Sequence, residues 1–294
     1  MQDIEVLIAR NLIPLTAALI VIAFGLWIAL RMLVGKLRER LWVRVVRFRQ
    51  ELVAHPRTQD LRNRVPMLAR LRTPTMFGGS HLFLDLLAGF LLVLAALSMF
   101  LHVADETGVD ESLGRFDDRL AAALRESAST SVLRFFSAVT HLGDVAVQTG
   151  LCIAGASLLV LRGQRLLAAI WIAAIAGNGL LNRLLKTVFE RTRPLHEHGW
   201  TAEQGWSFPS GHSSGAVAVY GMLAYLAIRL LPSAWHMPVA LSAITAVLLV
   251  GCSRVVLHVH YFSDVLAGYA SGSAWLIVCI GAAEVMRAQG RARP

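Results

Sequence analysis

Three short polar segments stand out in this otherwise apolar chain, because together they carry the residue types that phosphate chemistry uses. The segments are Lys186 with Arg193-Pro194, then Pro209-Ser210-Gly211-His212, and then Ser253-Arg254 with His260 and Asp264. They supply three cations, two imidazoles and one carboxylate, and each lies beside the end of an apolar stretch. A site built from them would hold an anion between helix ends.

The three cations are suited to hold a phosphate group. Phosphoryl transfer needs positive charge and hydrogen-bond donors around the nonbridging oxygens. Arg193 and Arg254 can contact phosphate through two donors each, and Lys186 adds a compact charge. Because Arg193 precedes Pro194, it is biased toward an extended backbone, which predicts a loop just beyond the helix of Lys186. The alternative for each cation taken alone is snorkelling at a membrane interface.

Ser210 and Gly211 are expected at the start of a helix. Ser210 is a preferred N-cap residue and stands directly before an apolar stretch that begins near His212. Its hydroxyl and the free amides of Gly211 and His212 would face an anion, with the helix dipole adding attraction. Taken alone, this segment is equally consistent with simple helix capping.

His260 and Asp264 lie four residues apart, so they share a face if the last helix begins near His260. The carboxylate would then bond one imidazole nitrogen and leave the other free to attack phosphorus. A rival is His258, which is four residues after Arg254 and would share its face on an unbroken helix. We favour His260 because Asp264 is in helical register with it.

The order and spacing of these segments closely resemble the three-part signature of the type 2 phosphatidic acid phosphatases, a superfamily that also includes the vanadium haloperoxidases. Six residues separate Lys186 from Arg193, and five separate Arg254 from His260. The resemblance covers roughly the last two thirds of the chain. It also selects His260 over His258.

The resemblance implies a role for each signature residue. His260 is the expected nucleophile that forms a phosphohistidine, Asp264 orients it, and His212 protonates the leaving oxygen and then activates water. The expected phosphate-binding residues are Lys186, Arg193, Ser210, Gly211 and Arg254. No metal and no other cofactor is expected, because the side-chain cations take the place of a metal.

Composition places the chain in a membrane. Of its 294 residues, 56% are hydrophobic and 16% are charged, and the mean hydropathy is +0.58. Several apolar runs approach or exceed the roughly 20 residues that cross a bilayer as helix. We predict seven spans, over 12–34, 82–103, 138–161, 166–187, 210–231, 237–257 and 264–286.

The predicted fold is all-α, a polytopic membrane helix bundle with a six-helix phosphatase core and one extra N-terminal transmembrane helix. Residues 1–80 would hold the extra helix and a basic loop, and residues 81–294 the six-span phosphatase domain. We expect the first helix to be retained, because no small-residue cleavage site follows it. Cys152, Cys252 and Cys279 lie inside apolar runs and are interpreted as buried structural thiols.

Charge asymmetry predicts the topology. The segment 31–72 is strongly basic and is expected in the cytoplasm, whereas the segment 105–126 is mainly acidic and is expected outside. Alternation from there places all three signature segments on the extracytoplasmic side and the C-terminus in the cytoplasm. The net charge of +9 is thus concentrated where topology requires it, so no nucleic-acid partner is expected.

Other polar residues near the outer face receive smaller roles. His141 and Asp144 begin the third span and are interpreted mainly as helix-end caps, although they could reach the site. Arg191 is off the matched spacing and is expected to be solvated. The connection 195–208, which is rich in aromatic residues, is expected to anchor at the interface.

The leading hypothesis is an integral membrane enzyme, in a bacterial inner membrane, that hydrolyses a terminal phosphate of a lipid phosphate or diphosphate. Undecaprenyl diphosphate, phosphatidylglycerol phosphate, phosphatidic acid and lipid A phosphates are the substrate classes that the resemblance implies, and the first two are favoured. Membrane lipids are the expected partners. The alternatives are lipid phosphotransfer through the same phosphohistidine, haloperoxidase chemistry, and a non-catalytic lipid-phosphate binding or transport protein.

Overall fold

The structure is a computed structural model that describes residues 11, 13–22, 25, 28–29, 32, 40, 43–44, 47, 82–108, 111–194 and 203–291. The chain divides into two compact units, residues 1–24 with 91–280, and residues 25–90 with 281–294. All signature residues lie in the first unit. The predicted boundary near residue 80 falls outside the described residues, and so does most of the basic loop.

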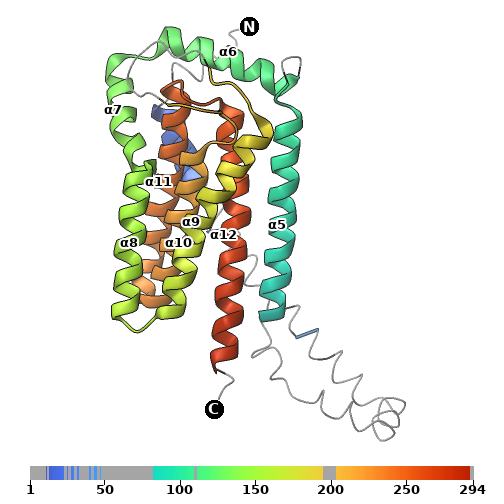
Figure 1. Cartoon of the computed structure of the whole chain (residues 1–294), viewed down its shortest axis with the longest axis vertical. Helices are drawn as coiled ribbons and strands as arrows, with labels where there is room; N and C mark the ends of the chain where they lie inside the picture. The colour runs from blue at the N-terminus through green and yellow to red at the C-terminus, as the bar shows by residue number, and fades with distance from the viewer. Residues whose placement is uncertain are drawn as a thin grey trace, which may run out of the picture. The chain divides into compact units, whose positions relative to one another are not determined.

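The described helices follow one another along the chain with short connections, except for the long connection 190–210 between α9 and α10 (Figure 1). They are α5 (Leu82–Asp105), α6 (Ser112–Ser127), α7 (Thr130–Thr140), η3 (His141–Gly143), α8 (Val145–Leu161), α9 (Arg165–Phe189), α10 (Gly211–Leu230), η4 (Ser233–Trp235), α11 (His236–Val256) and α12 (Phe262–Arg291). No strand occurs in the described ranges. The second unit contains only the start of α5 and the end of α12 from this series.

The all-α membrane fold is confirmed, but the count of seven spans is not. Among the described residues, α5, α9, α10, α11 with η4, and α12 are long and apolar enough to cross a bilayer. The predicted span over 138–161 is instead a broken one, in which α7 with η3 meets α8 at a bend of 41°. Of the predicted span over 12–34, the apolar helix Ile13–Ile22 is described, and most of the rest lies outside the described residues.

Helix α6 was not predicted, because its segment is polar overall and was interpreted as an outer connection. It is amphipathic, and it runs across the end of the bundle between α5 and α7 (Figure 1). Its buried residues are Gly114, Asp117, Leu120 and Leu124, which recur at helical spacing on one face. Of the acidic residues on α6, Asp118 and Glu126 are exposed, whereas Asp117 is buried.

Apolar side chains face outward along the spans, as lipid contact requires. On α5, only Phe100 and Val103 are buried, while Leu94, Leu97 and Leu101 are exposed. A soluble protein would rarely expose so continuous an apolar surface. These helices therefore fit a hydrocarbon environment, where each helix satisfies its own backbone hydrogen bonds.

Small residues allow α10 and α12 to pack closely. A Cβ atom added at Gly272 would lie 2.7 Å from the carbonyl oxygen of Ser214, and one added at Gly268 would lie 2.7 Å from that of Ser210. Gly268 and Gly272 are one turn apart, which is the small-xxx-small arrangement of close membrane helix pairs. This contact sets the start of α10 against the start of α12, where two of the signature segments lie.

We expect Gly272→Val to lower stability, because the added methyl groups must push the backbone of α10 away. Overpacking of this kind typically costs about 1–3 kcal/mol. The measurement is the thermal unfolding midpoint in detergent. Gly150→Val in α8 is the control, because a Cβ there meets no atom within 4 Å. Equal midpoints for the two variants would contradict the close packing.

Candidate active site

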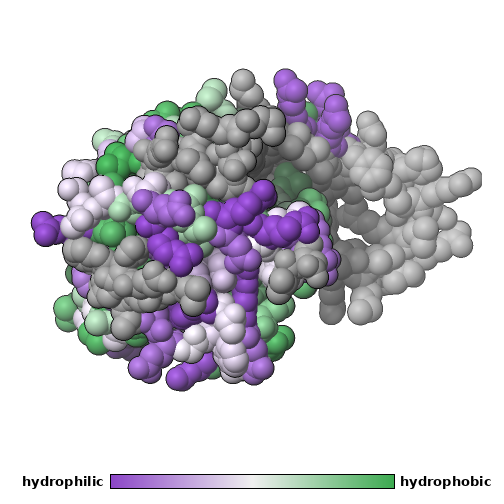
Figure 2. Space-filling view, turned by 90° about the horizontal axis from the view of Figure 1, so that it is seen from above, coloured by the Kyte–Doolittle hydropathy of each residue, from purple (hydrophilic) through white to green (hydrophobic). Residues whose placement is uncertain are grey.

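The three signature segments meet at the end of the bundle where α6 lies (Figure 1). The end of α9, the start of α10 and the turn between α11 and α12 bring them together. Seen from that end, hydrophilic side chains cross the middle of the face and reach its left and lower edges, with apolar side chains between them along the rim (Figure 2). The arrangement gives the bundle one polar end that contains the candidate site.

Lys186 and Arg193 bind the loop that leads into α10. The Lys186 ammonium donates to the carbonyl oxygens of Trp206 and, at 3.3 Å, of Ser207. Arg193 lies beyond the end of α9, as predicted, and its Nε donates to the carbonyl oxygen of Gly205 at 3.0 Å. Burial lowers the pKa of Arg193. The two cations thus hold this loop in place at the wall of the site.

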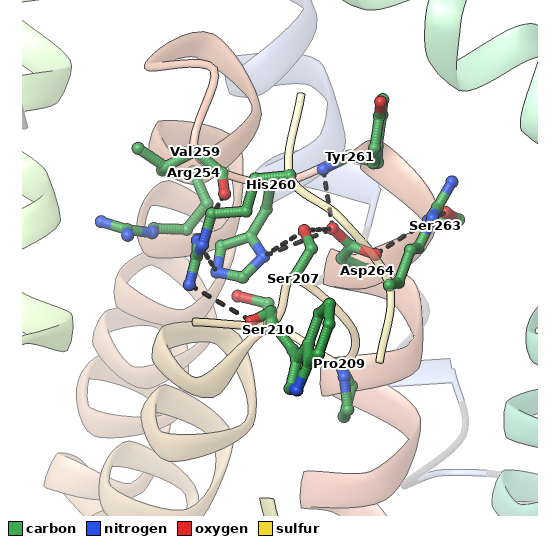
Figure 3. Close-up of polar contacts among 12 residues, drawn as sticks. Ser207, Pro209, Ser210, Arg254, Val259, His260, Tyr261, Ser263 and Asp264 are labelled. Atoms are coloured by element: carbon green, nitrogen blue, oxygen red, sulfur yellow. Dashed lines mark hydrogen bonds and ion pairs between the residues drawn. The ribbon is translucent and has the colours of Figure 1, made fainter. Parts of the chain in front are cut away.

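His260 lies at the centre of a hydrogen-bond network (Figure 3). Its Nδ1 is 3.3 Å from Oδ2 of Asp264 and 3.3 Å from Oγ of Ser207. The Ser207 hydroxyl donates to the same carboxylate oxygen. The Nη1 of Arg193 lies 3.3 Å from the other ring nitrogen, Nε2. Although α12 begins only at Phe262, the expected contact between His260 and Asp264 is therefore present.

These contacts fix the tautomer of His260. A guanidinium group can only donate, so Nε2 accepts from Arg193 and the ring proton is on Nδ1, facing the Asp264 carboxylate. Burial lowers the pKa of His260 to about 3, since only 3% of the residue is exposed. The imidazole is neutral at physiological pH, with a lone pair on Nε2.

His258 lies elsewhere. Helix α11 ends at Val256, and His258 takes a left-handed backbone conformation with φ of 57°, so Arg254 and His258 do not share a face of an unbroken helix. The Nε2 of His258 is 3.1 Å from the carbonyl oxygen of Ala121 in α6. Its imidazole thus packs against α6.

His212 also has a carboxylate partner. Its Nε2 lies 3.0 Å from Oδ1 of Asp144, whose other oxygen is 2.7 Å from Nδ1 of His141. Asp144 occupies the N-cap position of α8, but its side chain makes no capping hydrogen bond. The interpretation of Asp144 as a cap is therefore wrong for its side chain, which holds His212 instead.

Arg254 is almost fully buried behind Glu203. Its Nη1 donates to Thr140 Oγ1 at 2.6 Å, and its Nη2 contacts the Glu203 carboxylate. Burial opposes ionisation of Glu203, but Arg254 and His212 hold its pKa below the ordinary value. The carboxylate also lies 3.9 Å from Nη2 of Arg193 and 3.9 Å from Nδ1 of His212. The negatively charged carboxylate of Glu203 therefore lies among Arg254, Arg193 and His212.

Ser210 caps α10 as predicted. Its Oγ accepts from the backbone N–H of Ser213 at 3.4 Å and from the Ser213 hydroxyl at 3.0 Å. The side chain is fully buried, so its hydroxyl serves the cap. Gly211 faces Asn182, because an added Cβ would lie 2.9 Å from Asn182 Oδ1. Gly211 thus allows the Asn182 side chain to lie close to the backbone.

A cavity of about 680 Å³ opens beside these residues. Of the predicted site residues, Lys186, Arg193, Gly211, His212 and His260 line it. Ser210, Arg254 and Asp264 do not line it and lie behind its wall. The rest of the wall comes from one face of α8, one face of α9 and the loop 203–206. A phosphate group in the cavity would meet a neutral imidazole and several cations.

Two contributing residues were missed or misread from the sequence. Ser207 binds Asp264 and His260, but nothing in its spacing marks it. Arg191 was expected to be solvated, which is wrong, because its side chain is only 15% exposed and its Nη1 lies 2.8 Å from Asp264 Oδ1. The available signal was its position two residues before Arg193 in an extended segment, which places both side chains on one side.

No metal centre is evident within the described ranges, where no group of three or more His, Cys, Asp or Glu side chains is placed to hold an ion. The cationic side chains and backbone amides remain as the groups that could bind an anion.

Comparison with known proteins agrees with this geometry. The model of the PAP2 superfamily matches residues 167–285, which include all three segments. Phosphatidylglycerophosphatase B of Bacillus subtilis (strain 168) is 32% identical over 191 residues, covering 62% of this chain and 86% of that protein. Lipid A 1-phosphatase of Rhizobium johnstonii is 35% identical over 121 residues, covering 36% of this chain and 45% of that protein.

A solved structure is similar as well. The crystal structure of a transmembrane PAP2 type phosphatidylglycerolphosphate phosphatase from Bacillus subtilis superposes with a TM-score of 0.61 at 28% identity. The match covers 65% of this chain and 96% of that one. With the signature segments assembled at one end of a membrane helix bundle, the chain belongs to the PAP2 superfamily.

Proposed function

We propose that this protein is a membrane lipid phosphatase that removes a terminal phosphate through a phosphohistidine on His260. The observation that carries the proposal is the neutral, buried His260, whose Nε2 lone pair lies at the wall of a cavity that Lys186 and Arg193 also line. The relatives named phosphatases support hydrolysis of a phosphate ester. No step requires a metal ion.

In the first step, the Nε2 lone pair of His260 forms a bond to phosphorus while the bond from phosphorus to the leaving oxygen breaks. The Nδ1 proton stays hydrogen-bonded to Asp264, which balances the positive charge that develops on the ring. His212 gives a proton to the leaving oxygen, while its Nε2 stays hydrogen-bonded to the carboxylate of Asp144.

In the second step, water attacks the phosphorus of the phosphohistidine. His212 accepts a proton from the water, the bond between nitrogen and phosphorus breaks, and its electron pair returns to Nε2. Inorganic phosphate leaves, and both histidines regain their starting protonation states. Lys186, Arg193 and Arg254 stabilise the phosphoryl oxygens in both steps. The contact between Arg254 and Glu203 supports this role, because phosphate oxygens would compete for the same guanidinium.

We place the site at the extracytoplasmic face of a bacterial inner membrane, with the C-terminus in the cytoplasm. The charge asymmetry of the loops supports this orientation, since α6 lies in the acidic segment 105–126 at the same end as the site. Lipid would enter sideways, because the cavity wall continues along α8 and α9.

Arg183 supports a substrate with a second phosphate. It lines the cavity three residues before Lys186 on α9, so it lies about one turn deeper in the membrane. Further along are Ile175, Ala176 and Ile153, which form an apolar wall. A cation inside a span usually marks a substrate path. Along the cavity, Lys186 and Arg193 come first, then Arg183, and then the apolar wall. This order fits a lipid with a terminal phosphate, an internal phosphate and hydrocarbon chains.

This order favours phosphatidylglycerol phosphate or undecaprenyl diphosphate over phosphatidic acid. Each favoured lipid carries an internal phosphate between the reacting group and the hydrocarbon. Phosphatidic acid has only one phosphate and would leave Arg183 without an anionic partner.

We expect His260→Ala to abolish phosphate release from lipid in detergent micelles that contain a metal chelator. The nitrogen that attacks phosphorus is removed in that variant, whereas His258→Ala should keep a substantial fraction of activity because its imidazole contacts α6. Inorganic phosphate release is the measurement. An inactive His258 variant beside a normal His260 variant would overturn the assignment. Loss of lipid phosphate without free phosphate would indicate transfer to an acceptor.

We expect Arg183→Gln to raise KM for phosphatidylglycerol phosphate about tenfold, the size of one charged hydrogen bond. The KM for phosphatidic acid should change less than about twofold, because that lipid lacks the internal phosphate. Arg165→Gln, at the opposite end of α9, is the matched control. Equal changes for both lipids would refute the internal-phosphate contact.

A further inference from the structure

Helix α6 carries a carboxylate on its buried face. Asp117 is only 1% exposed and lies in helical register with the buried Leu120 and Leu124. Burial raises the pKa of Asp117, and burying an ionised carboxylate is costly unless it is paired. An apolar residue would serve better if docking α6 were the only requirement.

The partners of Asp117 come from two other parts of the chain. Its Oδ1 accepts from the backbone N–H of Ser263 at 3.1 Å, and its Oδ2 contacts the Ser263 hydroxyl. The same oxygen lies 3.0 Å from Nη2 of Arg191. Asp117 is therefore fixed against the first turn of α12 and the segment that follows α9.

Arg191 joins two carboxylates. While Nη2 binds Asp117, Nη1 lies 2.8 Å from Asp264 Oδ1 and 2.7 Å from Ser263 Oγ. The guanidinium carbon is 4.3 Å from the centre of the Tyr261 ring, which covers one face of the group. Only a planar fork with separate nitrogens can make both contacts at once.

Every oxygen of the Asp264 carboxylate is thus held in place. Oδ1 receives Arg191, and Oδ2 receives Ser207, His260 and, at 2.9 Å, the backbone N–H of Tyr261. These contacts leave little freedom for the side chain, which is fully buried (Figure 3). Arg191 is thus one of the groups that hold Asp264 toward His260.

The charges of Asp117, Arg191 and Asp264 also affect His260. Arg191 carries one positive charge and contacts two carboxylates, so Asp117 balances it and leaves the charge of Asp264 for His260. That charge is most useful when His260 carries a phosphoryl group and becomes cationic. A neutral residue at position 117 would leave Arg191 to compete with His260 for Asp264.

We propose that Asp117 and Arg191 are positioning residues for the reaction, through which α6 sets the orientation and available charge of Asp264. The inference rests on the proposed function of His260. Neither residue lines the cavity, and both act on Asp264, which Arg191 contacts directly and Asp117 contacts through Arg191. Their effect falls on the chemical step, where the imidazole becomes charged, and not on lipid binding.

The test is the steady-state kinetics of Asp117→Asn with phosphatidylglycerol phosphate in micelles. This variant keeps the shape of the side chain and removes its charge. We expect kcat to fall on the order of tenfold to a hundredfold, as for other partners that orient a reacting group, with KM changed less than about twofold. Rapid-quench measurement should show slower formation of the phosphoenzyme. Glu126→Gln, which changes an exposed carboxylate near the other end of α6, is the matched control and should retain kcat.

Arg191→Lys provides a second test that does not depend on the folding of Asp117→Asn. It keeps the positive charge but cannot bind both carboxylates through separate nitrogens, so kcat should fall while KM is kept. A folded Asp117→Asn or Arg191→Lys protein with wild-type kcat would overturn the inference. His260→Ala is assayed beside them, because activity in that variant would refute the proposed function itself. An inactive His260 variant with normal positioning variants would refute only the positioning role.

Discussion

The burial of His260 against Asp264 is the constraint on which the rest of the site depends. A buried imidazole is held neutral, and a buried carboxylate must be fully hydrogen-bonded to remain ionised. The second requirement recruits Ser207, Arg191 and the backbone of Tyr261 around Asp264. The connection between α9 and α10, the turn between α11 and α12, and helix α6 therefore converge on one pair of side chains. The close contact of α10 with α12 at Gly268 and Gly272 brings those loops together.

Two histidines, each held by a carboxylate, have opposite roles in the proposed mechanism. Asp264 leaves Nε2 of His260 facing the Arg193 guanidinium, and Asp144 leaves Nδ1 of His212 facing the Glu203 carboxylate. The pairing explains how one site can contain both a nucleophile and a proton donor without a metal ion in the proposed mechanism.

Much of the fold followed from the sequence, because lipid imposes long apolar helices whose ends are marked by polar residues. The ranges of α9, α10 and α11 agree with prediction within two residues at each end. Helix α6 and the bend between η3 and α8 were not predicted. An amphipathic helix within a polar segment has no long apolar run that would indicate it. The contacts of Asp117 with Ser263 join positions 146 residues apart, and sequence spacing carries no information about pairs so distant. Arg191 was misread because its partners are set by that same tertiary packing.

The central claim is that a phosphoryl group passes through His260. The most direct measurement is acid-labile, alkali-stable phosphate on the protein, isolated by rapid quench during turnover of phosphatidylglycerol phosphate and located by mass spectrometry. We predict phosphate on His260 in the wild-type protein and none in His260→Ala. Phosphate on another residue, or undiminished turnover in His260→Ala, would contradict the account.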